Sequence, residues 1–548
     1  MPEFNEVKKH IEMIEFCGKC GDCTTSGTQI TTAKRHVDKP CPVKNVLGFE
    51  AYDARGRIII LKNLLKNKLK VDDSILNWAY TCTQCGSCKE TCLAIEGGID
   101  TPILMESLRI DLVNQGFKLN KHKEILASVI KNKNPYGEPL NEKQLFLKGK
   151  KFNQDSKNLL FLGCTSSYRQ QELAIAAINL LENLGIDFQI LEDENCCGSV
   201  LKRYGFVKDF EDIAKSNLNE LKEKNITNII FPCAGCYRTF KLDYEPFNNA
   251  SFKFYHLVEF LEEYLNDKSF KFKLNSHKKI TYHDPCHLGR HCGVYEAPRN
   301  LLKNIQNSTF IEFDALRNFS HCCGAGGGVK SSNPDLALKT ALNRLQEAKD
   351  KSVEIIISSC PFCEKNLKDG INEGINDIEI LDITEFLFNS LKKDLSSQIV
   401  VDEGEIESNI GKEYMNFLAK YPEIFADLTE SSILDFAIYN GIDDLEEEKD
   451  PAFKFNVLRT GGGIEIKPGG ADEPDLELAL SINAVEKLIK NKTKNDYAEQ
   501  FGLFYNEPDE EEGWIDFILH KRTKTLIKMG YGKFAEEAGI LDDESEVD

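Results

Sequence analysis

The middle of the chain carries two kinds of hydrophobic pattern that alternate. Short apolar runs bounded by polar residues, such as NIIF at 228–231 and EIIIS at 354–358, predict buried strands. Longer stretches with apolar residues at helical spacing, such as QELAIAAINLLENLG at 171–185 and PDLALKTALNRLQEAKD at 334–350, predict helices. Strands that alternate with helices indicate parallel α/β units, which place their sites at the carboxyl ends of the strands.

The two ends of the chain carry other patterns. In ARGRIIILKNLLKNKL, residues 54–69, the apolar positions predict a helix. Residues 453–480 alternate apolar and polar positions around two glycine-rich turns, which predicts successive antiparallel hairpins. Helix and strand patterns follow at 482–490 and 514–534. We therefore expect a C-terminal α+β module over 453–540, preceded by an acidic linker with helices over 396–452 and followed by a disordered end at 541–548.

Charge is distributed unevenly along the chain. The 548 residues carry a formal net charge of −20, and residues 401–548 contain 36 acidic against 15 basic residues. This balance does not favour nucleic acid, whose backbone needs a basic face. We see no apolar run of about 18 residues and no secretion signal, so we expect a cytoplasmic protein with no membrane span of its own, which would reach a membrane through a partner.

The chain contains 19 cysteines, all of them before residue 401. In a reducing compartment, clustered cysteines favour metal binding over disulfides. Two N-terminal runs have the spacing of [4Fe–4S] ferredoxin sites, in which the fourth ligand of each cluster comes from the other run. A pair of zinc ribbons is the alternative, which the Cys-x2-Cys-x2-Cys triplets disfavour. We expect two cubane clusters, one bound by Cys17, Cys20, Cys23 and Cys92, the other by Cys41, Cys82, Cys85 and Cys88.

The middle of the chain is a tandem duplication with an offset of 122 to 127 residues. Each copy has a lone cysteine, a Cys-Cys-Gly motif and a final Cys-x2-Cys. Adjacent cysteines pair poorly with each other and make a poor zinc half-site. Five thiolates exceed the needs of a cubane, so we infer an opened cluster with one bridging sulfur, which the following glycines let the backbone approach. The two sets are Cys164, Cys196, Cys197, Cys233 and Cys236, and Cys286, Cys322, Cys323, Cys360 and Cys363.

The motif Cys-x31-Cys-Cys-x35-Cys-x2-Cys at 164–236 and its counterpart at 286–363 resemble the CCG domain of heterodisulfide reductase. With the N-terminal cluster pair, residues 1–395 resemble the fused iron–sulfur subunits of that superfamily, including the catalytic subunit of the membrane-linked heterodisulfide reductase and the iron–sulfur subunit of glycolate oxidase. The resemblance implies two noncubane [4Fe–4S] clusters that hold a substrate disulfide between them, which makes the ten CCG cysteines catalytic. It implies an α+β multidomain fold, with an all-α two-cluster domain at 1–118, a linker at 119–157, and α/β CCG domains at 158–268 and 269–395 related by a pseudo-twofold duplication.

Several residues beside the clusters are further candidates. One of His283, His287, His291 and His321 is a candidate proton donor to a nascent thiolate, although for any single one a packing or hydrogen-bonding role beside a cluster is the favoured interpretation. Cys292 falls outside both five-cysteine sets and is expected to be a free thiol. Arg290 and Arg299 are weak candidates for holding an anionic group of a substrate.

The C-terminal module is weakly similar to sterol-carrier-protein-like lipid-binding domains in its order of β-meander, proline-aspartate and short helix. An acidic docking domain for a partner is the alternative, because the module carries no catalytic signature.

These observations predict an iron–sulfur oxidoreductase of heterodisulfide reductase type. Electrons would enter through the two cubane clusters and cleave, or form, a disulfide such as coenzyme M–coenzyme B at the paired noncubane clusters. The alternative is an electron-transfer subunit that carries electrons from a flavoprotein dehydrogenase to quinone. Since neither a Walker loop nor a convincing dinucleotide motif is present, we expect an electron-donating partner protein, namely a flavoprotein, a hydrogenase or a membrane cytochrome-type subunit, within a hetero-oligomeric complex of anaerobic metabolism.

Overall fold

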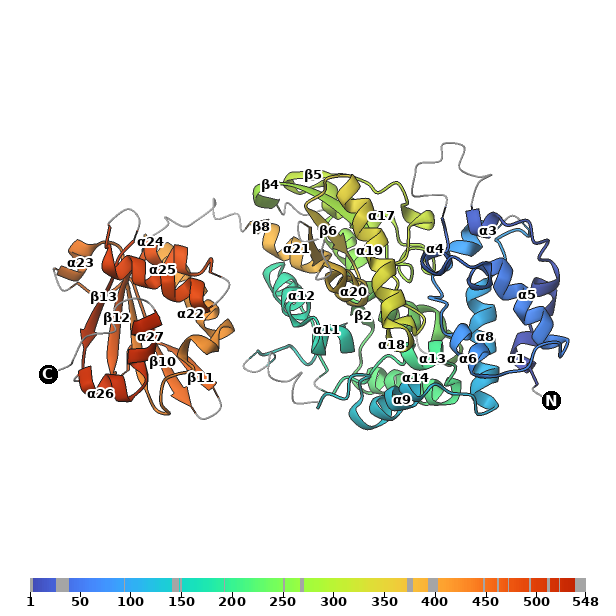
Figure 1. The fold of residues 1–548 in the computed structure, drawn as a ribbon, viewed down its shortest axis with the longest axis horizontal. Coiled ribbons are helices and arrows are strands. Elements are labelled where there is room, and N and C mark those ends of the chain that lie inside the picture. The colour runs from blue at the N-terminus through green and yellow to red at the C-terminus, as the bar shows by residue number, and fades with distance from the viewer. Residues whose placement is uncertain are drawn as a thin grey trace. The chain divides into compact units, whose positions relative to one another are not determined.

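The structure of the protein is a computed structural model. It describes residues 3–25, 39–92, 94–139, 147, 150–191, 193–249, 252–266, 271–371, 378–392, 403–446, 449–460, 463–471, 473–491, 494–509, 513–521 and 523–537. The chain divides into two compact units, residues 1–394 and 395–548. Helices and strands both contribute to the fold (Figure 1), as the predicted α+β class requires. Within the described residues, we find no helix with the length and apolar character needed to cross a membrane.

The first unit begins with a helical region that holds no strand in its described part. Helix α5 forms where the pattern predicted one, because Asp53 caps its first turn and Ile58, Leu61 and Leu64 are buried. This face packs against α8 in a core of its own. The helices are α1 (Asn5–Lys8), α2 (Ile11–Glu15), α3 (Asp22–Thr25), α4 (Pro42–Leu47), η1 (Glu50–Tyr52), α5 (Ala54–Leu65), α6 (Asp73–Ala79), α7 (Ser87–Glu90), α8 (Thr101–Asn114) and α9 (Asn120–Asn132).

Helix α9 lies in residues 119–157, which we expected to be a linker. It carries the buried Val129 and packs against α18, a short helix of the second CCG copy, so that expectation is wrong for this stretch.

The first CCG copy is a three-stranded parallel sheet in the order β1-β2-β3 with helices around it. The predicted strand at 228–231 is β2, whose last three residues are buried, and the predicted helix at 171–185 is α12. The elements are β1 (Asn158–Leu160), α11 (Cys164–Tyr168), α12 (Gln171–Asn183), α13 (Ser199–Tyr204), α14 (Val207–Glu223), β2 (Asn228–Phe231), α15 (Ala234–Arg238), η2 (Thr239–Asp243), η3 (Glu245–Phe247), β3 (Lys253–His256) and α16 (Leu257–Leu265).

The second copy repeats this plan with a parallel sheet in the order β5-β4-β6-β7. The short strand β8 pairs antiparallel with the start of β4. The matching helices α16 and α21 both begin with a capping box, from His256 and Glu259 and from Asp382 and Glu385. The two copies share one hydrophobic core. The elements are β4 (Lys271–His283), α17 (Glu296–Lys303), β5 (Gln306–Phe310), η4 (Arg317–Phe319), α18 (Val329–Ser332), α19 (Pro334–Asp350), β6 (Ile355–Ser358), α20 (Pro361–Ile371), β7 (Glu379–Asp382), α21 (Ile383–Ser390) and β8 (Leu391–Lys392).

A buried arginine joins the helical region to both CCG copies. The Arg109 side chain on α8 makes five hydrogen bonds, and every acceptor is a backbone carbonyl. Ala79 and Cys82 belong to the helical region, Arg203 to the first copy and Gly327 to the second. Arg109 therefore fixes three parts of the unit at one point.

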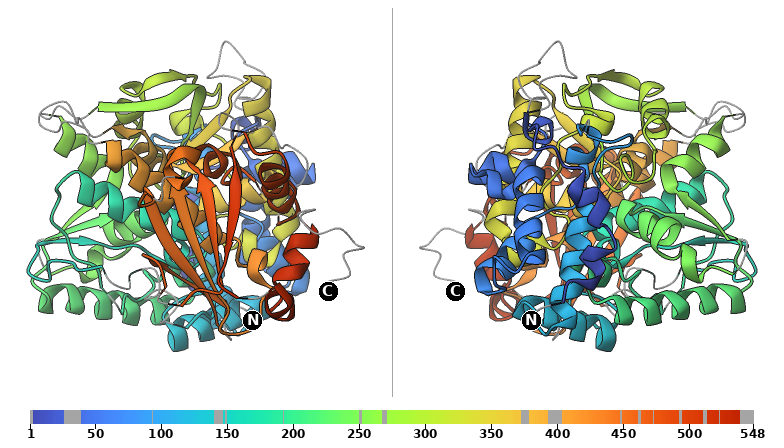
Figure 2. Two further views of the ribbon diagram at one scale, coloured as in Figure 1. Left: turned by 90° about the vertical axis from the view of Figure 1, so that its left-hand side faces the viewer. Right: turned by 90° about the vertical axis from the view of Figure 1, so that its right-hand side faces the viewer.

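The second unit is a five-stranded sheet in the order β11-β10-β9-β12-β13, covered by helices (Figure 2). Its core is separate from that of the first unit. The elements are α22 (Glu403–Lys420), η5 (Pro422–Phe425), β9 (Ile433–Tyr439), α23 (Ile442–Glu446), β10 (Phe453–Thr460), β11 (Gly463–Pro468), β12 (Leu476–Ser481), α24 (Ile482–Leu488), α25 (Lys494–Asn506), β13 (Ile515–Leu519), α26 (Thr523–Lys528) and α27 (Tyr531–Glu537).

Two expectations for this unit are wrong. Only the first predicted hairpin forms: β10 pairs with β11, but β12 crosses the sheet and lies parallel to β9. All six residues of β12 are buried, so it suits the centre of a sheet rather than an edge. Residues 396–452 contain the expected helices, α22 and α23, but they also contain the central strand β9, so this stretch is part of the module and not a linker. The predicted disordered end, 541–548, lies outside the described residues.

Candidate iron–sulfur centres and the cavity between the CCG copies

The first N-terminal cysteine set surrounds one small cavity. Cys17, Cys20 and Cys23 lie on the loop before α3 and at its start, and Cys92 follows α7. All four line a space of about 20 Å³. Cys20 is exposed, so this set lies at the surface. The structure thus brings together the four residues that the crossed ferredoxin pattern assigned to one cluster.

The second N-terminal set surrounds a neighbouring cavity of similar size. Cys41 immediately precedes α4, and Cys82, Cys85 and Cys88 come from the loop into α7. Arg57 holds this loop, since its guanidinium donates to the Trp78 carbonyl at 3.3 Å and to Thr81 Oγ1 at 2.9 Å. Cys41 therefore reaches its predicted partners despite the long insertion before it.

The five cysteines of the first CCG copy converge at the carboxyl end of its sheet. Cys164 follows β1, Cys233 and Cys236 follow β2, and the vicinal pair precedes α13. The Glu194 carboxylate accepts hydrogen bonds from the backbone N–H groups of Leu162 (3.0 Å) and Gly163 (2.7 Å), which ties the Cys164 loop to the vicinal pair. Thiol–thiol contacts join Cys164 to Cys196, Cys196 to Cys197, Cys197 to Cys236, and Cys236 to Cys233.

The second copy repeats this arrangement. Cys286 follows β4, and Cys360 and Cys363 follow β6. Thiol contacts join Cys286 to Cys322, Cys322 to Cys323, Cys323 to Cys363, and Cys363 to Cys360. His283 also lies here, with a ring nitrogen within 4.8 Å of the sulfurs of Cys323 and Cys363.

The four sets form a row. Cys88 lines both N-terminal cavities. Cys85 of the second N-terminal set contacts Cys322 of the second CCG set. Cys360 of that set contacts Cys233 of the first CCG set. The two CCG copies, although duplicated, therefore differ in their distance from the N-terminal sets.

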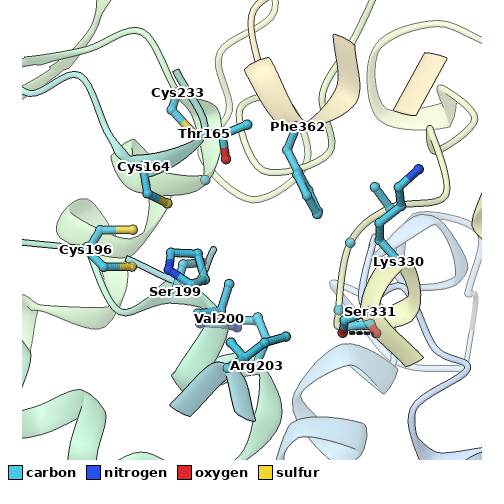
Figure 3. Close-up of a pocket in the computed structure, with 18 of the residues that line it drawn as sticks. Cys164, Thr165, Cys196, Ser199, Val200, Arg203, Cys233, Lys330, Ser331 and Phe362 are labelled. Carbon is cyan, nitrogen blue, oxygen red and sulfur yellow. Dashed lines mark hydrogen bonds between the residues drawn. The ribbon is translucent and has the colours of Figure 1, made fainter. Parts of the chain in front are cut away.

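A large cavity lies between the two CCG copies. Its volume is about 550 Å³, and nine of the ten CCG cysteines line it, Cys322 being the exception. Figure 3 shows Cys164 and Cys196 on one wall, with Phe362 and Lys330 opposite. Helix α9 adds Ile125 and Ser128 to the wall. The cavity has the size of a small-molecule site and exposes sulfur from both copies to one ligand.

The glycines after each vicinal pair have two distinct roles. The N–H of Gly198 donates to Cys196 Sγ and that of Gly324 to Cys322 Sγ, both at 3.4 Å, and both glycines have a positive φ. The motif thus aims a backbone donor at its own first sulfur. The later glycines pack elsewhere: a Cβ on Gly327 would lie 2.4 Å from the Cys82 carbonyl oxygen. Close approach to a cluster, which we expected of the whole run, does not explain Gly327.

The candidate histidines and arginines divide by their contacts. The Arg299 guanidinium is buried against Asp284 and Glu312, so it is a structural ion pair and not an anion site. Arg290 donates hydrogen bonds to the backbone carbonyls of Cys85, Asn318 and Ser320, so it too has a structural role.

The four candidate histidines have different contacts: His287 lines the large cavity, His283 contacts the Cys323 thiol, His291 accepts a hydrogen bond from Arg238, and His321 pairs with Glu347. Cys292 lines none of the three cysteine-lined cavities described above.

The protonation of the thiols tests whether the sets fit metal clusters. Burial raises the pKa of Cys41 to about 12, and burial followed by the nearby Asp53 raises that of Cys23 to about 12. In the CCG copies, thiol contacts split the pKa values, so that the pKa of Cys197 falls to about 6 mainly through its hydrogen bond with Cys196. Crowded buried thiols cannot all ionise unless cations compensate them. The donor sets therefore fit iron, which binds thiolates.

Some wall residues were not foreseen from the sequence. Helix α9 contributes Lys121, Ile125 and Ser128 to the large cavity, and Arg109 joins the three parts of the unit. We expected a linker over residues 119–157; the amphipathic pattern of α9 could have indicated a helix there, but not the surface against which that helix packs. For Phe362, the only signal in the sequence of a place at the cavity was its position between Cys360 and Cys363.

The second unit contains its own cavity, of about 230 Å³. Its walls are apolar, with Phe436 and Leu478 on the sheet and Phe501 on α25. Two of its tyrosine hydroxyls are hydrogen bonded elsewhere, Tyr497 to Tyr414 and Tyr531 to Asp475 at 2.9 Å. The cavity therefore offers little polar recognition.

Comparisons with known proteins agree with the cysteine pattern. The CCG cysteine-rich domain matches residues 159–241 and 280–368. One subunit of the dihydromethanophenazine:CoB–CoM heterodisulfide reductase of Methanosarcina acetivorans is 36% identical, over 69% of this chain and 94% of the relative. The same subunit of that reductase from Methanosarcina barkeri is 34% identical over the same shares of the two chains.

More distant relatives carry other names. One subunit of the fumarate reductase (CoM/CoB) of Methanothermobacter marburgensis is 31% identical over 56% of this chain and 60% of that protein. The EtfAB:quinone oxidoreductase of Syntrophomonas wolfei is 26% identical over 69% of this chain and 58% of that protein. The paired CCG domains and the identity to the methanogen reductase together place this chain: it belongs to the family of iron–sulfur oxidoreductases that contains this CoB–CoM heterodisulfide reductase subunit.

Proposed function

We propose that this chain reductively cleaves the coenzyme B–coenzyme M heterodisulfide in the cavity between its two CCG copies. The observation that carries the proposal is the cavity itself, which exposes cysteine sulfurs of both copies to one space of about 550 Å³. The relative that is 36% identical is named for this activity, which supports the choice of substrate.

The residues that would hold the clusters follow from the four sets. Cys17, Cys20, Cys23 and Cys92, and Cys41, Cys82, Cys85 and Cys88, would hold two cubane [4Fe–4S] clusters, and each five-cysteine CCG set would hold a noncubane one. When bound, these clusters supply electrons one at a time. Cleavage of the disulfide consumes two electrons and two protons and releases two thiols. The electrons come from a reduced partner protein and the protons from water.

The side chains around the cavity would orient a bound substrate. Phe362 and Val200 offer apolar contact, while basic side chains line the same cavity. Arg169 is one of these, paired with Glu138 at 2.6 Å and about one third exposed. A partly exposed pair of this kind exchanges its carboxylate for an anionic group of a substrate at little cost. The contact between Cys85 and Cys322 gives the second CCG copy the shorter route from the N-terminal sets.

The test is oxidation of reduced viologen by the anaerobically purified chain, with and without the heterodisulfide. Full loading requires about sixteen irons per chain, four for each of four [4Fe–4S] clusters. Rapid oxidation that depends on the heterodisulfide is expected. No turnover from a fully loaded sample would rule out this substrate.

Serine variants separate the sites. Cys360→Ser and Cys233→Ser are expected to lose iron from one CCG set each and to lose turnover. Cys292→Ser is the matched control, because this thiol lines none of the cysteine-lined cavities and its loss is expected to leave iron content and rate unchanged. Loss of iron in Cys292→Ser would contradict the assignment.

The electron-transfer alternative receives less support. The EtfAB:quinone oxidoreductase is more distant, at 26% identity. A relay also does not require a cavity of about 550 Å³ between two complete cysteine sets. Reduction of a quinone analogue by the loaded chain, without any turnover of heterodisulfide, would favour the relay.

A second function is favoured by the apolar cavity of the C-terminal unit, and we propose that it binds one acyl or isoprenoid chain. Leu519 and Ile527 line the cavity and are also exposed, at 53% and 40%, so they mark an apolar mouth. The bonded tyrosine hydroxyls leave apolar contact as the main attraction. This arrangement suits the sterol-carrier-like interpretation better than an acidic docking domain.

The full chain would be mixed with palmitate and examined by native mass spectrometry. Ala535→Trp, which adds a large side chain to the lining, is expected to abolish the adduct. Glu536→Trp, on the exposed neighbouring position, is the control and is expected to retain it. Equal retention by both variants would contradict this site.

A further inference from the structure

The loop that follows Cys286 reaches back to the second N-terminal cysteine set. Arg290 on this loop donates from Nε to the Cys85 carbonyl at 2.7 Å. The ring of His291 lies beside Gly86, the residue directly after Cys85. One segment of the second CCG copy thus contacts the loop that would hold the neighbouring cubane cluster.

The hydrogen bonds of His291 fix where its proton lies. Arg238 Nε donates to His291 Nδ1 at 3.0 Å, and Arg238 is itself held by Asp243 at 2.5 Å. A guanidinium has no acceptor, so Nδ1 must carry a lone pair and the proton of the neutral ring must lie on Nε2.

The protonated nitrogen faces the cysteine loop. Nε2 is buried and has no hydrogen-bond partner among the described residues. It lies 3.5 Å from the position that a Cβ on Gly86 would occupy, and Gly86 itself lines the small cavity of the second N-terminal set. The Cys85 carbonyl oxygen also lies near the ring, but it accepts from Arg290 at 2.7 Å and makes no hydrogen bond of acceptable geometry with Nε2. A buried N–H without an acceptor is costly, so this donor indicates an acceptor in the cysteine-lined space.

We propose that His291 donates a hydrogen bond from Nε2 to a sulfur of the cubane cluster held by Cys41, Cys82, Cys85 and Cys88. The proposal rests on the cluster assignment made above. Arg238 acts as the positioning residue, because it fixes the tautomer that presents this proton. Gly86, with a φ of +79°, gives the ring access that a side chain would occupy.

The consequence is a difference between the two cubane sites. Hydrogen bonds to cluster sulfurs are among the features that set the reduction potential, and a donor stabilises the more negative, reduced form. The site nearer the second CCG copy is the one with this donor, so it becomes the easier of the two to reduce. The electron then leaves the exposed first site for a site already in contact with the catalytic cysteines.

Two substitutions separate the two hydrogen bonds of the ring. In His291→Asn the amide lies where Nδ1 lay and can still accept from Arg238, but it does not reach the cysteine loop. In His291→Gln the longer side chain can place an amide N–H where Nε2–H lay. His277→Asn, an exposed histidine hydrogen bonded to Thr309, is the matched control.

The measurement is a redox titration of the full-length loaded chain followed by EPR, with iron content determined on each sample. In His291→Asn, the equilibrium constant for one-electron reduction of one cubane cluster is expected to fall about tenfold. This corresponds to a shift of its EPR signal by about 59 mV to more negative potential. His291→Gln should restore the potential to near the wild-type value, and His277→Asn should leave the potential unchanged. A Cys20→Ser background, which alters the other cubane, would identify the signal that moves.

The outcomes separate this inference from the function it rests on. If His291→Asn retains its iron and titrates like the wild type, the N–H has another acceptor and the inference is wrong while the clusters stand. If the wild type binds no cubane cluster, the ligand assignment and the inference fall together. Failure to turn over the heterodisulfide would contradict only the proposed substrate, and the EPR titration would still test the hydrogen bond from His291.

Discussion

The glycine run after the second vicinal pair gives the sharpest prediction, because it packs one part of the first unit on another. Gly327 has a φ of +59°, and a Cβ there would lie 2.4 Å from the Cys82 carbonyl oxygen and 2.8 Å from the Thr83 carbonyl carbon. Gly327→Ala therefore places a methyl group inside a contact between the second CCG copy and the cubane loop. Gly185→Ala is the matched control, since Gly185 has a φ of +70° and open space around its missing side chain.

The two substitutions share one cost and differ in another. The left-handed backbone costs an alanine about 1–2 kcal/mol at either position. Gly327→Ala adds overpacking of a tight contact, which costs about 1–3 kcal/mol more. We therefore expect Gly327→Ala to lower the free energy of unfolding of the first unit by about 2–5 kcal/mol, against about 1–2 kcal/mol for the control.

The assay is anaerobic urea unfolding of the loaded chain, with the cluster absorbance and the far-ultraviolet circular dichroism recorded together. The shift in midpoint at constant slope gives the difference in free energy. We also expect dithionite to reduce the cubane sites of Gly327→Ala normally, while reoxidation by the heterodisulfide is slowed, because the Cys82 loop moves away from the second CCG copy. Equal losses in the two variants, within about 0.5 kcal/mol, would refute the steric argument.

Three further predictions concern other parts of the chain. Burial, followed by the nearby Glu364, raises the pKa of Glu385 to about 8. The stability contributed by the proton on Glu385 is therefore complete below about pH 4.5 and is lost as the pH rises through 8. Glu385→Gln should flatten this part of the pH–stability profile, and an unchanged profile would contradict the prediction. Arg299→Leu leaves Asp284 buried without its cation and should lower the free energy of unfolding by about 3–5 kcal/mol. The KM for the disulfide should stay unchanged. A raised KM would indicate that Arg299 takes part in substrate binding. Phe455→Ala removes a fully buried ring stacked on Phe436 and should cost about 3–5 kcal/mol in the calorimetric transition of the C-terminal unit, with heterodisulfide turnover as the control that stays constant.

The parts of the fold that the sequence predicted are those with local signals. The strand β2, the helices α5 and α12, and the repeat of lone cysteine, vicinal pair and final pair all follow from periodicity and spacing within a few residues. The ferredoxin pattern also predicted that Cys92 would lie with the first cysteine run and Cys41 with the second, and each lines the corresponding cavity; their roles as cluster ligands stay a prediction.

The parts that could not be predicted depend on contacts between distant segments. Strand β12 has an apolar pattern that suits either a hairpin or a central strand, and only its place beside β9 decides between them. The acidic composition before residue 453 hid β9, although that strand is apolar. Gly327 looked like part of a cluster loop, but the segment against which it packs lies over 240 residues earlier.

The buried Arg109 bears on how the protein matures. All five of its hydrogen bonds go to carbonyl groups, and no carboxylate of the described residues is hydrogen bonded to it. Burial lowers the pKa of Arg109, whereas the nearby Cys82, Tyr80 and Glu106 raise it. A cluster held by Cys82 and its companions would keep these residues as thiolates and so would add negative charge beside this cation. Insertion of the cofactor and closure of the three parts around Arg109 are then mutually reinforcing steps of biogenesis. Without a cluster, the cation at this junction would keep only the carbonyl dipoles, the Tyr80 ring and the charge of Glu106 as partners, so we expect the chain without iron to unfold more readily.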